Sequence, residues 1–431
     1  MKKLFKSIVL FCLLGLIVLI LASCEQFLDD LFAPQGSEQT TTKQNGEMTT
    51  TPPETHTHKF GDWVTAKEAT KAEDGAKERS CSCGEKEIQN IPAIGSLGLS
   101  YKTYPDDGIC WIMGIGTCKD ADLYIPSEID GCKVTRIWGN AFRNCRNLTS
   151  VTIPDSVLEI GDASFSGCTN LEKITIGESI ATINIGMFEG CDKLIQKENG
   201  ILYVDRWVIG CDVNLQSVTL REDTVGISES ALYTSQADSI ILPKSLMYIK
   251  GNSIPCTIIS VTIPESVISI DAWAFSACYQ LIEVYNLSSV TLTKENFPNV
   301  LDVYTSADIP SKLWTDVNGY VFYEDGQVCY LIDYQGADNE LTLPETCNGK
   351  NYAIHRNALS HHLDLTSVII PAGITDVGDE AFRFCTALVD ITFKGTKAQW
   401  NSMVADAVKW DYYTGSGNYT LHCIDGDIVK S

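Results

Sequence analysis

The chain has 431 residues, 44% of them hydrophobic and 20% charged, and its formal net charge at pH 7 is −23. This length is too great for one compact core, while the hydrophobic share is that of an ordinary folded protein. An acidic surface repels phosphate backbones, so the charge argues against nucleic acid as a partner.

Residues 1–23 have the pattern of a lipoprotein signal peptide. Three lysines precede an uncharged run of 15 residues, whereas a membrane-spanning helix needs about 20. The run ends in Leu-Ala-Ser-Cys24, which resembles the bacterial lipobox. The resemblance implies cleavage before Cys24, attachment of lipid to its thiol, and anchoring in the cell membrane with the chain exposed on the extracellular surface. The alternative is an ordinary signal peptide with a chance cysteine.

Residues 24–55 are rich in Thr and Pro and offer little apolar surface to bury. This composition predicts a flexible tether that holds the folded part away from the membrane. We expect no further role for it.

Residues 56–95 have histidines at one end and Cys-Ser-Cys-Gly near the other, which indicates a separate small module. It resembles a short module in surface proteins of gut clostridia and their relatives, although Lys71 stands where that module usually has a cysteine. Two imidazoles and two thiols suit zinc, but one residue between thiols is fewer than in the common zinc sites. A zinc site, a disulfide and a module with neither all remain open, and we expect no other cofactor. The candidate metal ligands are His56, His58, Cys81 and Cys83.

Residues 96–395 repeat one unit with a fixed period. Phe142, Phe165 and Phe188 are spaced 23 residues apart, and a period in the twenties is typical of a solenoid. Within a unit, Val151-Thr-Ile153 alternates as a half-buried strand does, and the following proline ends the strand. We therefore expect a repeat solenoid, mainly β with short turns and helices, of about ten rungs of about 23 residues with terminal caps.

The stretches 148–168 and 171–191 follow the pattern L-x-x-V-T-I-P-x-S-V-x-x-I-G-x-x-A-F-x-x-C with few departures. This unit resembles the leucine-rich repeats of BspA-like bacterial surface proteins. The resemblance covers the chain from about residue 97 onward. It implies a leucine-rich repeat solenoid that functions in adhesion.

Two segments interrupt the repeat, near 199–211 and 318–335, and each alternates about a polar turn as a hairpin does. Exposed aromatic side chains there would form contact platforms for a sugar or a protein; alternatively, they pack onto the solenoid. Residues 396–431 break the period and are expected to form a C-terminal cap with a helix at 398–408. The aromatic residues of the two segments are Tyr203, Trp207, Tyr320, Phe322, Tyr323 and Tyr330.

The outward positions of the predicted strands are repeatedly Ser or Thr. Stacked rungs would place these residues in two columns on one face, where their hydroxyls could bind an extended peptide or glycan. The alternative is the strand propensity of Thr at solvent-facing positions. The candidate binding residues are Ser150, Thr152, Thr175, Ser217, Thr219, Ser260 and Thr262.

A cysteine also recurs at one place in the repeat, and we expect it to serve as a small buried core residue. The sequence has no nucleophile motif such as G-x-S-x-G and no glycine-rich phosphate loop, so we predict no enzymatic activity. The recurring cysteines are Cys145, Cys168, Cys191, Cys278 and Cys385.

These features predict a lipid-anchored surface protein whose solenoid mediates adhesion to extracellular proteins or glycans. Polysaccharide capture and a structural surface scaffold without a host ligand are the alternatives. An exposed row of hairpin aromatics would favour sugar capture. A hydroxyl-bearing face with buried aromatics would favour protein adhesion or a scaffold.

Overall fold

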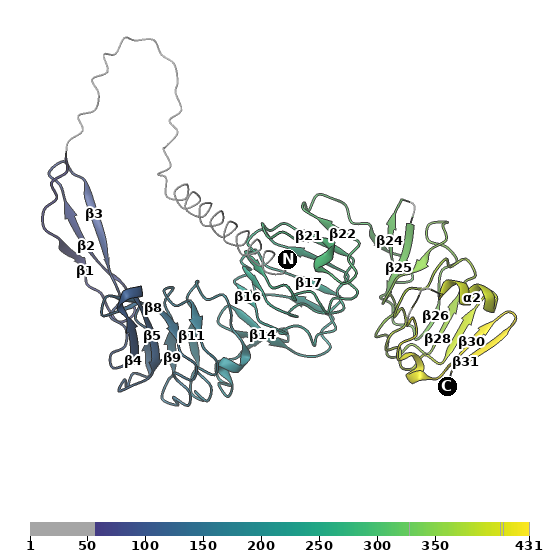
Figure 1. Cartoon of the computed structure of the whole chain (residues 1–431), viewed down its shortest axis with the longest axis horizontal. Coiled ribbons are helices and arrows are strands. Elements are labelled where there is room, and N and C mark those ends of the chain that lie inside the picture. The colour runs from purple at the N-terminus through teal and green to yellow at the C-terminus, as the bar shows by residue number, and fades with distance from the viewer. Residues whose placement is uncertain (1–56, 327, 406, 408, 431) are drawn as a thin grey trace, which may run out of the picture. The chain divides into compact units, whose positions relative to one another are not determined.

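The computed structural model describes residues 57–326, 328–405, 407 and 409–430 (Figure 1). The predicted signal peptide, Cys24, the tether and His56 lie outside these residues. What the sequence predicts for them therefore stays a prediction.

The small N-terminal module is a three-stranded antiparallel sheet with the order β1-β2-β3 (Figure 1). The guanidinium of Arg79 lies 5.1 Å from the ring centroid of Phe60 and 4.7 Å from that of Trp63. These cation–π contacts hold the segment before β1 against the sheet. The strands are β1 (Val64–Lys67), β2 (Gly75–Ser80) and β3 (Lys86–Ile91).

After this module the chain forms a β-solenoid of about 12 rungs with few helices, where the sequence predicts about ten. Equivalent strands of successive rungs pair in parallel, so that Ser150 lies opposite Lys173, one repeat later. The strands at 302–304 and 419–423 also extend parallel stacks. Their stretches lack the proline and the Phe–Cys pair of the repeat, so the sequence pattern does not reveal them as rungs.

The longer strands of the rungs form four separate sheets. Their inward residues are buried and alternate with solvent-facing ones, as in the pattern expected from the sequence. The strands are β6 (Asp122–Tyr124), β9 (Ser150–Thr152) and β11 (Lys173–Thr175); β15 (Ser217–Thr219) and β17 (Ser239–Ile241); β19 (Ser260–Ile263), β21 (Glu283–Asn286) and β22 (Asp302–Tyr304); and β26 (Glu340–Thr342), β28 (Ser367–Ile370), β29 (Asp390–Phe393), β30 (Tyr419–Cys423) and β31 (Gly426–Lys430).

The second strands of the rungs form three further sheets, and each contains an antiparallel hairpin at its N-terminal side. In every case the last strand of the hairpin pairs in parallel with the next short strand of the solenoid. The two segments expected as inserted hairpins are therefore hairpins that start new sheets. The strands are β4 (Ser100–Tyr104), β5 (Ile109–Gly114), β7 (Glu128–Ile129), β8 (Cys132–Ile137) and β10 (Glu159–Ile160); β12 (Gln196–Glu198), β13 (Ile201–Val204), β14 (Trp207–Cys211), β16 (Gly226–Ile227), β18 (Tyr248–Ile249) and β20 (Ser269–Ile270); and β23 (Leu313–Thr315), β24 (Tyr320–Asp325), β25 (Val328–Tyr334) and β27 (Ala353–Ile354).

The repeated phenylalanines and cysteines fill the interior of the solenoid. Phe142, Phe165 and Phe188 are fully buried, with ring centroids 5.2 and 5.9 Å apart along the stack. The thiol of Cys168 donates to the carbonyl oxygen of Phe142 at 3.1 Å, and that of Cys191 donates equally to Phe165. Cys278 and Cys385 are also buried core thiols, whereas Cys145, at the start of the column, is only half-buried.

The C-terminal end has one α-helix, α2 (Lys397–Met403), with Thr396 and Gln399 forming a capping box at its start. It ends earlier than the expected 398–408, because Val404 leaves the helical conformation after bonding to the Trp400 carbonyl. Trp400 and Trp410 are buried against this end of the core. Four short 3-10 helices complete the described elements: η1 (Pro105–Asp107), η2 (Ile185–Phe188), η3 (Lys294–Asn296) and η4 (Thr414–Gly417).

Candidate binding surface

Six exposed side chains gather on the outward side of strands β15, β17 and β19. Ser217 pairs with Ser239 and Thr219 with Ile241 in parallel register, and β19 packs beside β17. The intervening inward residues of these strands are buried in the core. We call this surface the hydroxyl face; its outward residues are Ser217, Thr219, Ser239, Ile241, Ser260 and Thr262.

The hydroxyl face is exposed to solvent but is not uniformly polar. Ile241 is 62% exposed and stands on the middle strand, opposite Thr219 of β15. Within the described residues, none of the five hydroxyls of this face has a side-chain hydrogen bond to another protein group. The face therefore presents solvent-exposed donors and acceptors around one exposed apolar residue.

The sequence predicts that the seven candidate binding residues form two continuous columns. In the structure they do not. Four of them belong to the hydroxyl face, but Ser150, Thr152 and Thr175 lie on β9 and β11, in a separate sheet. Ser150 is also engaged, because its hydroxyl donates to Asp122 at 2.6 Å and thereby lowers the pKa of that carboxyl. Between the two groups the chain forms the hairpin β13–β14, which belongs to a different sheet, and the stack of β9 and β11 does not continue into β15.

Thr175 instead lines a pocket of about 240 Å³ beside the hairpin β13–β14, together with Lys173, Asp205 and Arg221. Burial raises the pKa of Asp205, whose carboxylate accepts the backbone N–H of Ile176 at 2.8 Å. The Arg221 guanidinium lies over the ring of Tyr203, at 4.1 Å from the centroid. Asp205 thus ties the hairpin to the preceding rung, and Arg221 packs against it from the following rung.

Beyond β19 the outward positions change from hydroxyls to acids. The buried Glu283 carboxylate accepts hydrogen bonds from the Ser311 hydroxyl at 2.6 Å and the Lys312 backbone N–H at 2.8 Å. Asp302, on the next strand, accepts from the Tyr323 hydroxyl at 2.6 Å, and its hydrogen bond to Lys312 raises the pKa of that ammonium. This network ties the segment 311–323 to strands β21 and β22 and bounds the hydroxyl face.

The hairpin aromatics do not form a row of platforms. Tyr203, Trp207, Tyr320, Phe322 and Tyr323 are at most 5% exposed, and Tyr330 is half-buried. Trp207 stacks on Tyr248 and covers Gly226, where an added Cβ would lie 2.3 Å from the tryptophan ring. The rings pack onto the solenoid because each hairpin continues its core.

Exposed and half-buried aromatic rings gather elsewhere, at turns of the C-terminal rungs. We call this group the aromatic cluster; it comprises His361, Phe384, Tyr412 and Tyr413. Phe384 stacks on Tyr413 with ring centroids 5.3 Å apart, and Tyr413 is 53% exposed. His361, Phe384 and Tyr413 all have positive φ, between 57° and 65°. The repeat pattern does not predict this cluster. The feature of the sequence that could have revealed it is a bulky residue, His361 or Phe384, at the position where earlier rungs have Asn or Gly.

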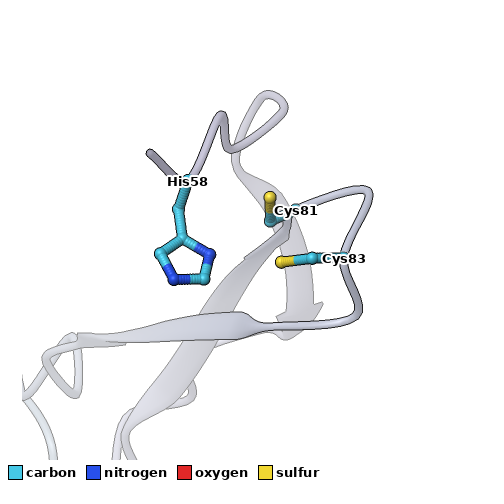
Figure 2. A group of neighbouring side chains, drawn as sticks. All are labelled: His58, Cys81 and Cys83. Atoms are coloured by element: carbon cyan, nitrogen blue, oxygen red, sulfur yellow. The ribbon is translucent and has the colours of Figure 1, made fainter. Parts of the chain in front are cut away.

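Three of the four candidate metal ligands are described, and they lie together at one end of β2 (Figure 2). Ligand atoms of His58, Cys81 and Cys83 are all within 4.8 Å of one another. A hydrogen bond from the Glu85 backbone favours the Cys83 thiolate, but the neighbouring Cys81 thiol and desolvation together outweigh it and raise the pKa of Cys83. These groups can hold a soft divalent metal ion.

The chain matches the family model described as a BspA type leucine rich repeat region, in six copies over residues 124–200, 209–328 and 342–404. The matched residues make up more than half of the chain. The protein therefore belongs to the BspA-type leucine-rich repeat family. BspA-like leucine-rich repeat proteins are bacterial cell-surface proteins, and their fold serves scaffolding and binding.

Several solved structures are similar to this chain. A leucine rich cell surface protein from Faecalibacterium prausnitzii A2-165 is 19% identical with a TM-score of 0.30, over 73% of this chain and 97% of that one. A leucine-rich repeat protein from Bacteroides ovatus ATCC 8483 is 17% identical with a TM-score of 0.30, over 69% and 75%. The T. pallidum leucine rich repeat protein is 25% identical with a TM-score of 0.25, over 44% and 81%. No curated protein matches.

Among the described residues, none of the helices has the length and apolar character needed to cross a bilayer.

Proposed function

We propose that this protein is a lipid-anchored surface adhesin whose hydroxyl face binds an extracellular protein or glycan. The observation that carries the proposal is the group of unpaired hydroxyls around the exposed Ile241. Anchoring through Cys24 is supported by the lipobox-like end of the N-terminal apolar run. The partners are an extracellular protein or glycan on one side and the membrane, through the lipid, on the other.

Binding at this face would combine many small contributions. Each hydrogen bond between a hydroxyl and a ligand contributes about 0.5–1.5 kcal/mol net. Ile241 adds apolar area that a partner can cover completely, at about 25 cal/mol per Å². A flat face with one aliphatic anchor suits a protein or peptide strand more than a sugar ring, which prefers aromatic faces.

The test uses the soluble chain from residue 25 onward against immobilised mucins, matrix proteins and purified polysaccharides. We expect micromolar or tighter binding to a protein target, and Ile241→Lys should weaken it at least tenfold. Thr342→Lys is the matched control, because Thr342 is an exposed outward residue of β26, in another sheet. Equal binding by the two variants would refute the hydroxyl face, and no binding at all would favour a scaffold.

Polysaccharide capture is the second candidate, and the exposed aromatic cluster favours it. The same experiment includes Phe384→Asn, because Asn is well tolerated at positive φ and should leave the turn intact. Selective loss of polysaccharide binding in this variant, with Ile241→Lys unaffected, would move the function from the hydroxyl face to the aromatic cluster.

A further inference from the structure

The N-terminal module has almost no hydrophobic core. Among its described residues, 57–95, Cys81 is the only hydrophobic residue that is buried. Val64 and Ile88, which sit on its outer strands, are 65% and 72% exposed. Folded units below about 40 residues usually need disulfides, a metal or a partner to be stable. Something other than apolar burial must therefore hold this sheet together.

The chain brings three metal-binding side chains to one place in this module. An isolated antiparallel bridge joins Phe60 to Cys81, which places the segment bearing His58 beside the end of β2. The turn that follows is closed by two hydrogen bonds, from the Cys81 N–H to the Glu85 carbonyl at 2.8 Å and from the Gly84 N–H to the Cys81 carbonyl at 2.9 Å. Gly84 has φ 97°, a conformation that favours glycine.

This turn explains how a spacing of one residue can still supply two ligands. Figure 2 shows both thiols and the imidazole at the same end of the sheet. Zinc–sulfur bonds of about 2.3 Å in a tetrahedron place two sulfurs about 3.8 Å apart. The three ligand atoms already lie within 4.8 Å of one another, so small rotations of the side chains would complete the geometry.

We propose that His58, Cys81 and Cys83 bind one zinc ion, which fastens the segment before β1 to the turn between β2 and β3. Two thiolates and one imidazole are the ligand set that zinc prefers over harder cations such as magnesium or calcium. Because His58 and Cys83 are exposed, water has access to the fourth position. The site is independent of the adhesive function and serves the stability of the module.

The first measurement is metal binding by the full chain, purified under reducing conditions and loaded with zinc or cobalt(II). We expect one zinc per chain that survives a weak competing chelator. Cobalt(II) should give the near-ultraviolet charge-transfer band of thiolate ligation. Cys81→Ser, Cys83→Ser and His58→Asn should each weaken binding at least tenfold. Cys423→Ser is the control, since it removes a half-buried thiol elsewhere and should bind as the parent does.

The second measurement separates a metal site from a merely structural role of these residues. Hydrogen exchange followed by mass spectrometry should speed up in β1–β3 when zinc is removed, while the rungs around β9 and β28 stay protected. Absence of stoichiometric zinc, or its retention in the Cys81→Ser and Cys83→Ser variants, would overturn the proposal. A Cys81–Cys83 disulfide in the protein isolated without reductant, accompanied by no bound metal, would overturn it equally.

Discussion

In five rungs the turn that follows the core phenylalanine or leucine has a residue with positive φ two positions later. In the N-terminal rungs this residue is Asn144, Gly167 or Gly190, which adopt the left-handed region at little cost. In the C-terminal rungs it is His361 or Phe384, for which the same conformation costs about 1–2 kcal/mol. The stacked rings of the aromatic cluster offset that cost, so this strain is stored at a solvent-facing surface.

His355 makes the stability of the C-terminal rungs depend on pH. Its ring packs edge-on against Tyr330 with centroids 5.4 Å apart, and burial lowers its pKa from 6.5 to about 4. A histidine held neutral in the folded state contributes its full stability above the unfolded pKa. That contribution is lost as the pH falls from about 6.5 towards about 4.

We therefore expect the free energy of unfolding of this region to fall by up to about 3 kcal/mol across that pH range. The fall is smaller to the extent that solvent reaches the ring and screens its charge. Urea denaturation at pH 7 and pH 4 measures the change. His355→Gln should flatten the pH dependence. An unchanged slope in that variant would show that other groups, such as the carboxylates of the acidic surface, control it.

At the scale of elements, an antiparallel hairpin begins each of the three sheets that the second strands of the rungs form. Strand β25 pairs antiparallel with β24 and parallel with β27, so it joins the hairpin to the rungs that follow. A disulfide between Cys329 on this strand and Cys347 before β27 reinforces the connection. Disulfides of this kind form outside the cytoplasm, in agreement with a surface location.

Removing this disulfide should loosen the C-terminal rungs. It closes a loop of 18 residues, for which a loss of about 2–4 kcal/mol is expected. The free energy of unfolding of Cys329→Ser/Cys347→Ser, measured by denaturant titration, should fall by that amount. The parent protein in reductant should match the double variant. A difference between the two would mean that the serines, and not the lost bond, cause the change.

At the scale of the whole molecule, the proposed adhesion would depend on display of the hydroxyl face at the cell surface. A tether and a lipid would hold many copies at the cell surface, where weak contacts add up because neighbouring copies bind at high effective concentration. Two or three acyl chains give stable anchoring, whereas one gives only marginal binding to a bilayer.

Cys24→Ala should therefore abolish incorporation of labelled palmitate and release the protein from the cells. Binding of the released protein to an immobilised target should keep its intrinsic affinity and lose its avidity. The readouts are palmitate label, the fraction of protein in the medium, and binding at low and high ligand density. Palmitate incorporation that survives the substitution would contradict anchoring at this residue.

Much of the fold can be predicted from the sequence because the solenoid is a local structure. The spacing of Phe142, Phe165 and Phe188 equals the offset between the paired strands β9 and β11, and alternation within 151–153 sets which side chains face inward. The recurrence of Cys168 and Cys191 likewise identifies core positions, since each rung repeats the environment of the last.

Only the tertiary structure decided which residues share a surface. The predicted hydroxyl columns are divided between separate sheets, so Ser150 and Ser217 do not stand in one row. Ser239 and Ile241 join the hydroxyl face through strand register, and His361 meets Phe384 through the stacking of turns. The physical reason is that repeat patterns encode neighbours one rung apart. The place where a stack starts or stops depends on pairing between strands, which a short period does not record.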